Sequence, residues 1–231
     1  MKKLIGIASV LALSTALVAA ASEDQEKKET KAKDEQTIIA EQLPSYPLMK
    51  CPVSGEALGS MGDAVDFVID GRLVRLCCKS CTKGVKENPE KVFEKIDEGV
   101  IAKQKASYPM KTCLISGKEL GSMGDPIDFV YGTRYVAFCC KGCIKGFQKN
   151  PDEQLAKVDA ALIEAQKKDY PIETCVVSNE PLEEPIDFLY GTTLVRFCCK
   201  MCVKEFKRDP ETYVREVQAA RDKKSAQKKE S

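Results

Sequence analysis

The chain of 231 residues contains no histidine and no tryptophan. Without histidine, neither a Ser–His nor a Cys–His catalytic pair can be built, which excludes the conventional hydrolases and acyl transferases. We therefore expect a protein that is not an enzyme. A metal site in this chain would also lack imidazole, so the twelve cysteines become the main soft ligands.

An excess of charge of one sign is missing too. The sequence has 36 basic and 35 acidic side chains, and this balance gives no electrostatic reason to expect a nucleic-acid partner. Only 43% of the residues are hydrophobic, while 31% are charged. Several small units are therefore expected in place of one large core.

The first 21 residues resemble a secretory signal. Lys2 and Lys3 precede an apolar run over residues 4–18, and small alanines at 19–21 form a cleavage site before Ser22. The apolar run is shorter than a bilayer-spanning anchor requires. We expect cleavage near Ala21/Ser22 and a periplasmic or secreted protein that is not transmembrane after cleavage. An oxidising compartment also makes disulfides an alternative fate for the cysteines.

Two polar segments frame the rest of the chain. Residues 22–44 are mostly charged and are expected to be a solvated leader, and residues 221–231 a polar tail. Between them the sequence repeats. Cys51, Cys113 and Cys175 are 62 residues apart, as are Cys77 and Cys139. This period predicts three modules, over 45–106, 107–168 and 169–220, each opening with Tyr-Pro.

The sequence pattern predicts the same local structure in each module. Alternating apolar and polar residues flank Asp70-Gly71, a dipeptide typical of a tight hairpin turn. The cysteine cluster follows the second strand and leads into a short helix. A second helix is predicted to begin at Pro89, Pro151 or Pro210, with the preceding Asn88, Asn150 or Asp209 as a side-chain N-cap. In the first module we expect the apolar stripe of that helix to pack on its own or the neighbouring module.

Modules of this size need a cross-link, because about 50 residues with two strands bury too little surface for stability. Three cysteines cluster at 77, 78 and 81, and the motif recurs at 139–143 and 198–202. At helical spacing, either Cys77 or Cys78 can share a face with Cys81. Cys51 lies in a short turn before the hairpin, the knuckle, and is a candidate third ligand of the same ion. A helix N-terminus and a nearby lysine (Lys79, Lys141 or Lys200) would favour thiolates.

This pattern of cysteine, hairpin, phenylalanine, Cys-x3-Cys and short helix resembles the TRASH and YHS-like metal-binding modules. The resemblance covers residues 45 to about 215 three times. It implies an α+β fold of three tandem treble-clef-like modules, and metal sensing, trafficking or resistance, often for copper or other soft metals. The implied ligands are Cys51, Cys77 and Cys81; Cys113, Cys139 and Cys143; and Cys175, Cys198 and Cys202.

The sequence departs from the C-x2-C knuckle of zinc ribbons. Its second position is Ser54, Ser116 or Ser178, and a hydroxyl is a poor ligand beside thiolates. Each cluster instead has an additional cysteine (Cys78, Cys140 or Cys199), which is a candidate fourth ligand or a spare thiol that points away. Sulfur-only sites suit Zn²⁺, Cu⁺ or heavier thiophilic ions, one per module, and argue against Mg²⁺ or Ca²⁺.

Two other recurrent features receive no chemical role. Met61 and Met123 lie in GSMG loops that the third module lacks, so we expect loop packing more than ligation. Asp66, Asp128 and Asp187 lie on the hairpins and are expected to be solvated.

The sequence thus favours an exported protein that binds soft metal ions for sequestration, trafficking or sensing, with a metal-transport or other exported protein as a candidate partner. A zinc- or disulfide-stabilised interaction scaffold is the alternative. A thiol-disulfide redox protein is a third reading, because Cys78 and Cys81 have C-x2-C spacing, although no thioredoxin-like βαβ unit surrounds them. The identity of the metal and the oligomeric state stay open.

Overall fold

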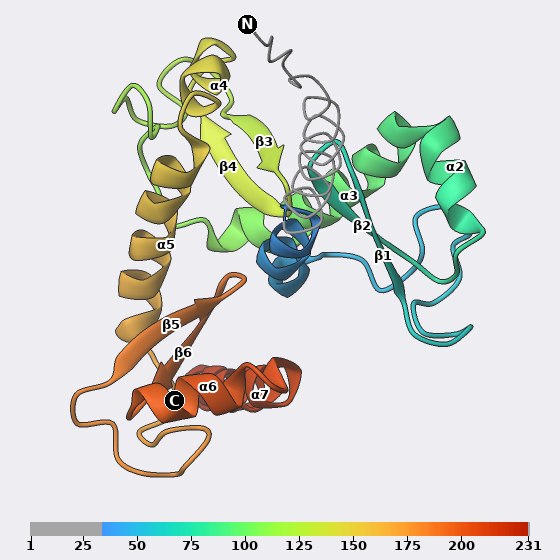
Figure 1. Ribbon diagram of the computed structural model, residues 1–231. Coiled ribbons are helices and arrows are strands. Elements are labelled where there is room, and N and C mark those ends of the chain that lie inside the picture. Colours follow the sequence, from blue (N-terminus) through green and yellow to red (C-terminus); the bar gives the residue numbers. More distant parts are fainter. Residues whose placement is uncertain (1–33, 231) are drawn as a thin grey trace, which may run out of the picture.

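The computed structural model describes residues 34–230 and shows an α+β fold built from three similar modules (Figure 1). The expected signal segment and residues 22–33 of the leader lie outside the described residues. Module one contains β1 (Val65–Ile69), β2 (Arg72–Leu76), α2 (Cys81–Glu87) and α3 (Pro89–Gln104). Module two contains β3 (Ile127–Tyr131), β4 (Arg134–Phe138), α4 (Gly142–Phe147) and α5 (Pro151–Lys167). Module three contains β5 (Ile186–Tyr190), β6 (Thr193–Phe197), α6 (Lys200–Phe206) and α7 (Pro210–Glu230). The 3₁₀ turns η1 (Leu43–Ser45) and η2 (Lys105–Ser107) precede modules one and two.

Each sheet is an antiparallel hairpin with a two-residue turn. Asp70 and Gly71 both have positive φ, 51° and 72°, as the sequence predicts for a tight turn. In the other two hairpins only the glycine is in this region, Gly132 at 61° and Gly191 at 63°. The second strand of each hairpin leads directly into the cysteine cluster of its module. The geometry of the hairpin turn therefore helps to determine the position of that cluster.

The core of each module is small and lies beside its cysteines. In module two the ring of Phe147 on α4 lies 5.6 Å from that of Phe138 and 5.8 Å from that of Phe129. Module three repeats this contact with Phe188, Phe197 and Phe206. The expected packing of hairpin and short helix is therefore present.

The long helices begin at Pro89, Pro151 and Pro210 as predicted, but their caps differ from the expectation. Asn88 and Asn150 make no side-chain cap hydrogen bond. Asn150 instead donates from its side chain to Glu153 at 2.7 Å. Only at Asp209 does the side chain accept a backbone N–H, from Thr212 at 3.4 Å.

Each long helix that precedes a hairpin also packs on that hairpin. Val92, Ile96 and Val100 of α3 share one buried cluster with Tyr135 and Ala137 of β4. Helix α5 makes the corresponding contact with β5 and β6. The apolar stripe of α3 thus packs on its own module and on the next one at the same time.

A glutamine holds each of these helices to the following hairpin. Gln104 donates to the carbonyl of Thr133 at 2.8 Å and accepts the backbone N–H of Tyr135 at 3.0 Å. Gln166 makes the same pair of bonds to residues 192 and 194, and Gln42 to residues 71 and 73. We call this arrangement the glutamine clamp. Residues 34–42 are helical, so the end of the expected solvated leader is the first copy of the helix that carries it.

The segment η1 lies where the three hairpin turns meet (Figure 1). Ser45 shares a hydrogen bond of 2.7 Å with Thr133 of the second turn. A Cβ added to Gly191 of the third turn would collide with the Pro44 carbonyl oxygen. Between these contacts lies a cavity of about 750 Å³ that contains no cysteine among its lining residues.

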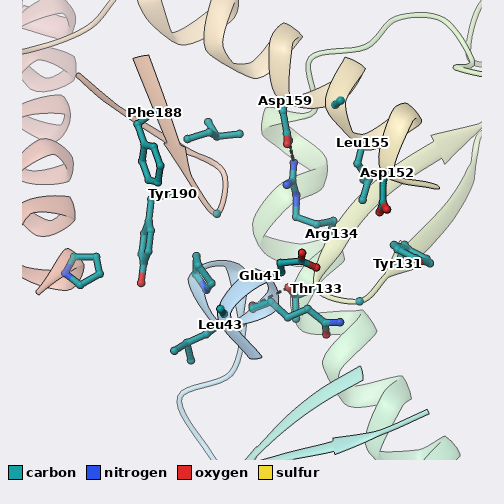
Figure 2. A pocket seen from close by; sticks show the side chains of 18 of the residues that line it. Glu41, Leu43, Tyr131, Thr133, Arg134, Asp152, Leu155, Asp159, Phe188 and Tyr190 are labelled. Carbon is teal, nitrogen blue, oxygen red and sulfur yellow. Dashed lines mark hydrogen bonds and ion pairs between the residues drawn. The ribbon is translucent and has the colours of Figure 1, made fainter. Parts of the chain in front are cut away.

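Figure 2 shows this cavity, with the aromatic rings of Phe188 and Tyr190 on one side and the Arg134–Asp159 ion pair on the other.

Helix α7 follows the third hairpin but carries different residues on the corresponding face. Where α3 and α5 have Val100 or Leu162, α7 has Arg221. The clamp glutamine is replaced by Ser225. None of the helices over residues 34–230 combines the length and apolar character needed to cross a bilayer.

Candidate metal centres

The three expected cysteine triads come together in the structure. The sulfurs of Cys51, Cys77 and Cys81 all lie within 4.8 Å of one another. The same is true of Cys113, Cys139 and Cys143, and of Cys175, Cys198 and Cys202. All twelve cysteines are free, and most members of the triads are buried. The three clusters can therefore each hold a metal ion.

The first cysteine of each triad is positioned by a tight knuckle. Cys51 donates its backbone N–H to Glu56 at 2.7 Å, and its carbonyl accepts from Gly55 at 2.9 Å. Gly55 has φ of 81°, a conformation that glycine adopts without strain. In module three Asn179 takes this place with φ of 61°. The second cysteine ends the hairpin, and the third opens the short helix.

The spacing of the sulfurs fits one tetrahedral ion. Cys77 and Cys81 are 3.8 Å apart, and the equivalent pairs measure 3.8 and 3.7 Å. Two thiolates bound to zinc at about 2.3 Å, at tetrahedral angles, lie about 3.8 Å apart. The donor set is thus compatible with a soft ion, and no histidine is needed to complete it.

The additional cysteines do not point away, contrary to one expectation. The sulfur of Cys78 lies 3.7 Å from that of Cys81 and 3.9 Å from that of Cys77. Cys140 and Cys199 repeat the first contact at 3.7 and 3.6 Å. Residues 77–80 precede α2, which begins at Cys81, so helical rotation per residue does not apply to them. Each triad therefore has a fourth sulfur at its edge.

The serines that replace the second knuckle cysteine contact the sulfurs. The hydroxyl of Ser54 lies 3.2 Å from the sulfur of Cys77, and Ser116 and Ser178 repeat this at 3.2 and 3.3 Å. Burial acts to raise the pKa of Cys51, but hydrogen bonds from Ser54 and nearby backbone amides prevail and lower it to about 6. The serine is therefore a hydrogen-bond partner of the thiolate site.

At the helix-start cysteines the expected stabilisation of the thiolate by the helix N-terminus does not prevail. Burial and the adjacent sulfurs raise the pKa of Cys81, Cys143 and Cys202 to about 12. One negative charge already placed on the first cysteine disfavours a second nearby. The lysines of the clusters are exposed. A bound cation would compensate the further thiolates.

The recurrent Tyr-Pro sequence, which received no role above, positions the knuckle. The hydroxyl of Tyr46 accepts the backbone N–H of Arg75 at 3.1 Å, and Tyr170 does the same with Arg196. Tyr108 instead packs the edge of its ring on Tyr135, 5.1 Å away. These contacts anchor the chain five residues before the first cysteine of each triad, and the spacing of the repeat could have revealed them.

Two expectations about the surface are corrected. The hairpin aspartates are half-buried and paired, where solvation was expected. Their partners are Arg75 for Asp66, Arg196 for Asp187, and Tyr135 with Lys105 for Asp128. Met61 and Met123 are 67% and 56% exposed, so the packing expected for them within the GSMG loops is slight.

Comparison of the chain with protein-family models, curated proteins and solved structures finds no match. The resemblance to TRASH and YHS-like modules therefore stays an expectation that rests on cysteine spacing.

Proposed function

We propose that the protein is an exported metal-binding protein that holds one soft ion, Zn²⁺ or Cu⁺, in each module for sequestration, trafficking or sensing. The observation that carries the proposal is that three cysteine sulfurs lie close together at the equivalent position of each of the three modules. A single cluster of thiols can arise for other reasons. Three with matching knuckles, serines and sulfur distances are better explained by a shared ligand.

Soft ions are favoured by the donor set. Thiolates without carboxylate or imidazole ligands suit Zn²⁺ or Cu⁺ and give hard ions such as Mg²⁺ no advantage. In each module the three triad cysteines would hold the ion, and the serine would orient and stabilise a thiolate. A bound ion would also supply the cross-link that each small core needs.

Native mass spectrometry of protein purified without oxygen tests the proposal. We expect three ions per chain and a mass that lacks residues 1–21. The matched variant Cys77→Ser should retain two ions, because one triad has lost a ligand. A chain that carries no ion and has few free thiols would instead support structural disulfides, and an intact Met1 would contradict export.

The scaffold alternative differs in how the ions exchange. Ions with a purely structural role need not leave, whereas a trafficking protein must release its ions to an acceptor. Transfer of the three ions to a competing soft-metal chelator on the timescale of minutes would favour metal handling. Retention of all three ions until the chain unfolds would favour the scaffold.

A further inference from the structure

Each module has one cysteine sulfur that is not a member of the triad but lies at its edge. Cys78, Cys140 and Cys199 lie 3.7, 3.7 and 3.6 Å from the helix-start cysteine of their own cluster. Of the two residues between these cysteines, the first is lysine in every module, but the second differs, being Ser80, Gly142 or Met201. The placement of the sulfur therefore depends on the backbone and not on one neighbouring side chain.

These sulfurs are more exposed than the first cysteine of each triad, although Cys81 and Cys198 of the triads are half-buried too. Cys51 and Cys77 are each only 1% exposed, and Cys113 and Cys175 are buried as well. In contrast, Cys78 and Cys140 are half-buried and Cys199 is exposed. An ion in the triad would thus have buried ligands on its inner side and the additional sulfur on the side that solvent reaches.

We propose that Cys78, Cys140 and Cys199 are exchange ligands, through which a soft ion passes between the buried triad and a thiol-bearing donor or acceptor in solution. This inference rests on the proposed function and specifies how its sites would load and unload. A thiol-bearing ligand is the matching chemistry, because every donor atom that the ion meets along this route is then sulfur.

The transfer is a ligand substitution without electron transfer. During loading, the exchange cysteine releases its proton to solvent and its sulfur forms a bond to the ion. One bond between the ion and the donor's sulfur breaks, and that sulfur takes up a proton. A triad cysteine next releases its proton and bonds to the ion, while the bond between the ion and the exchange sulfur breaks and that sulfur takes up a proton. The other two triad cysteines replace the remaining sulfurs of the donor in the same way. Unloading is the reverse sequence. Because no step changes an oxidation state, no oxidant or reductant is required.

The test compares the wild-type chain with the variant Cys78→Ser, Cys140→Ser, Cys199→Ser. Both are loaded with Cd²⁺ under nitrogen, and thiolate-to-cadmium absorption follows transfer to an excess of a small dithiol chelator. We expect the variant to keep three ions with nearly unchanged affinity. Its release should slow by about tenfold or more, as when one favourable step is removed from a reaction path.

The control replaces an exposed lysine on each short helix, two residues after the helix-start cysteine, in the variant Lys83→Ala, Lys145→Ala, Lys204→Ala. It also changes three residues and removes three charges but no sulfur, so release should remain close to that of the wild type. Cys199→Ser alone provides a milder variant, in which only the fastest phase of release should slow, since Cys199 is the most exposed of the three.

Unchanged release in both sulfur variants would overturn the inference, as would equal slowing in the lysine control. Binding of fewer than three ions by the triple serine variant would also overturn it, because the additional cysteines would then be permanent ligands. A wild-type chain that binds no cadmium would instead refute the proposed function itself.

Discussion

The serine in each knuckle has an oxygen atom where a cysteine would have sulfur, and this difference changes the residue from a metal ligand to a hydrogen-bond partner of the ligands. Ser54 stands where a zinc-ribbon knuckle has its second cysteine, and its hydroxyl lies 3.2 Å from the sulfur of Cys77. A hydroxyl that donates to a thiolate spreads the negative charge and restricts the orientation of the sulfur. Ser54 is thus expected to support ligands without being one.

Replacing Ser54 with alanine should weaken metal binding in module one alone. Partners that hydrogen-bond to ligands typically contribute about 10- to 100-fold to metal affinity, and we expect the lower end because Ser54 is exposed to solvent. Competition titration with a chromophoric chelator should show one site weakened and two unchanged. Ser60→Ala is the control, because that hydroxyl donates only to the carbonyl of Ala57. Equal affinity in all three sites of Ser54→Ala would contradict this role.

At this scale the spacing of cysteines predicted which sulfurs meet but not where the additional one points. Cys51 and Cys77 are brought together by a knuckle and a hairpin whose turn residues are visible in the sequence. The direction of Cys78 depends on the irregular turn over residues 77–80, where neither strand nor helix periodicity applies. A backbone that belongs to no regular element cannot be oriented from spacing alone.

Helices α3 and α5 are more than connections, because each has a glutamine clamp in its last turn. The amide of Gln104 satisfies one carbonyl and one N–H at the turn of the second hairpin, and the residue is only 7% exposed. Without the amide, two backbone groups in a buried place would lose their partners.

We therefore expect Gln104→Ala to destabilise module two strongly. The cost should be about 2 kcal/mol or more, since each unsatisfied buried polar group costs about 1 to 3 kcal/mol. Urea unfolding of the metal-loaded protein measures the change, and Gln148→Ala is the control at an exposed glutamine. A loss of stability no larger than in the control would mean that water or a neighbouring side chain replaces the clamp.

The elements themselves were largely predictable, and the clamp was not. Asp70-Gly71 and the prolines at 89, 151 and 210 mark turns and helix starts because their backbone preferences are local. Gln42 was hidden in a charged stretch that resembles a solvated leader. Its separation of 62 residues from Gln104 was the available signal. A glutamine in a helix is ordinary by composition, and only its tertiary partners give it a role.

At the scale of the whole molecule, the first metal site and the contact between modules one and two share one buried cluster. Cys51 and Cys77 belong to the same buried cluster as Ile96 of α3 and Tyr135 of β4. Strand β4 in turn leads to Cys139 of the next triad. The sequence leaves open whether the repeats are independent, and this continuity predicts that disorder in one module extends into the next.

Removing the first ligand set should therefore affect two modules. In Cys77→Ser we expect faster backbone hydrogen exchange in α3 and also in β3 and β4, while β5 and β6 change least. The reason is that α3 loses packing on one side and then holds the second hairpin less firmly. Hydrogen exchange with mass spectrometry measures this, and Cys199→Ser is the control for a sulfur lost elsewhere. Protection unaltered beyond α3 would show that the modules respond separately.

The replaced face of α7 has a consequence for how many ions such a chain can carry. Val100 and Gln104 of α3 make a socket for a following hairpin, and their counterparts in α7 are Arg221 and Ser225. A duplication that appended a fourth copy after α7 would meet a charged side chain where it needs an aliphatic one. Copies inserted between the existing modules would find a working socket on both sides. The number of metal sites can thus increase by insertion of modules between the existing ones. Adding a module after α7 would require at least the substitutions Arg221→Leu and Ser225→Gln.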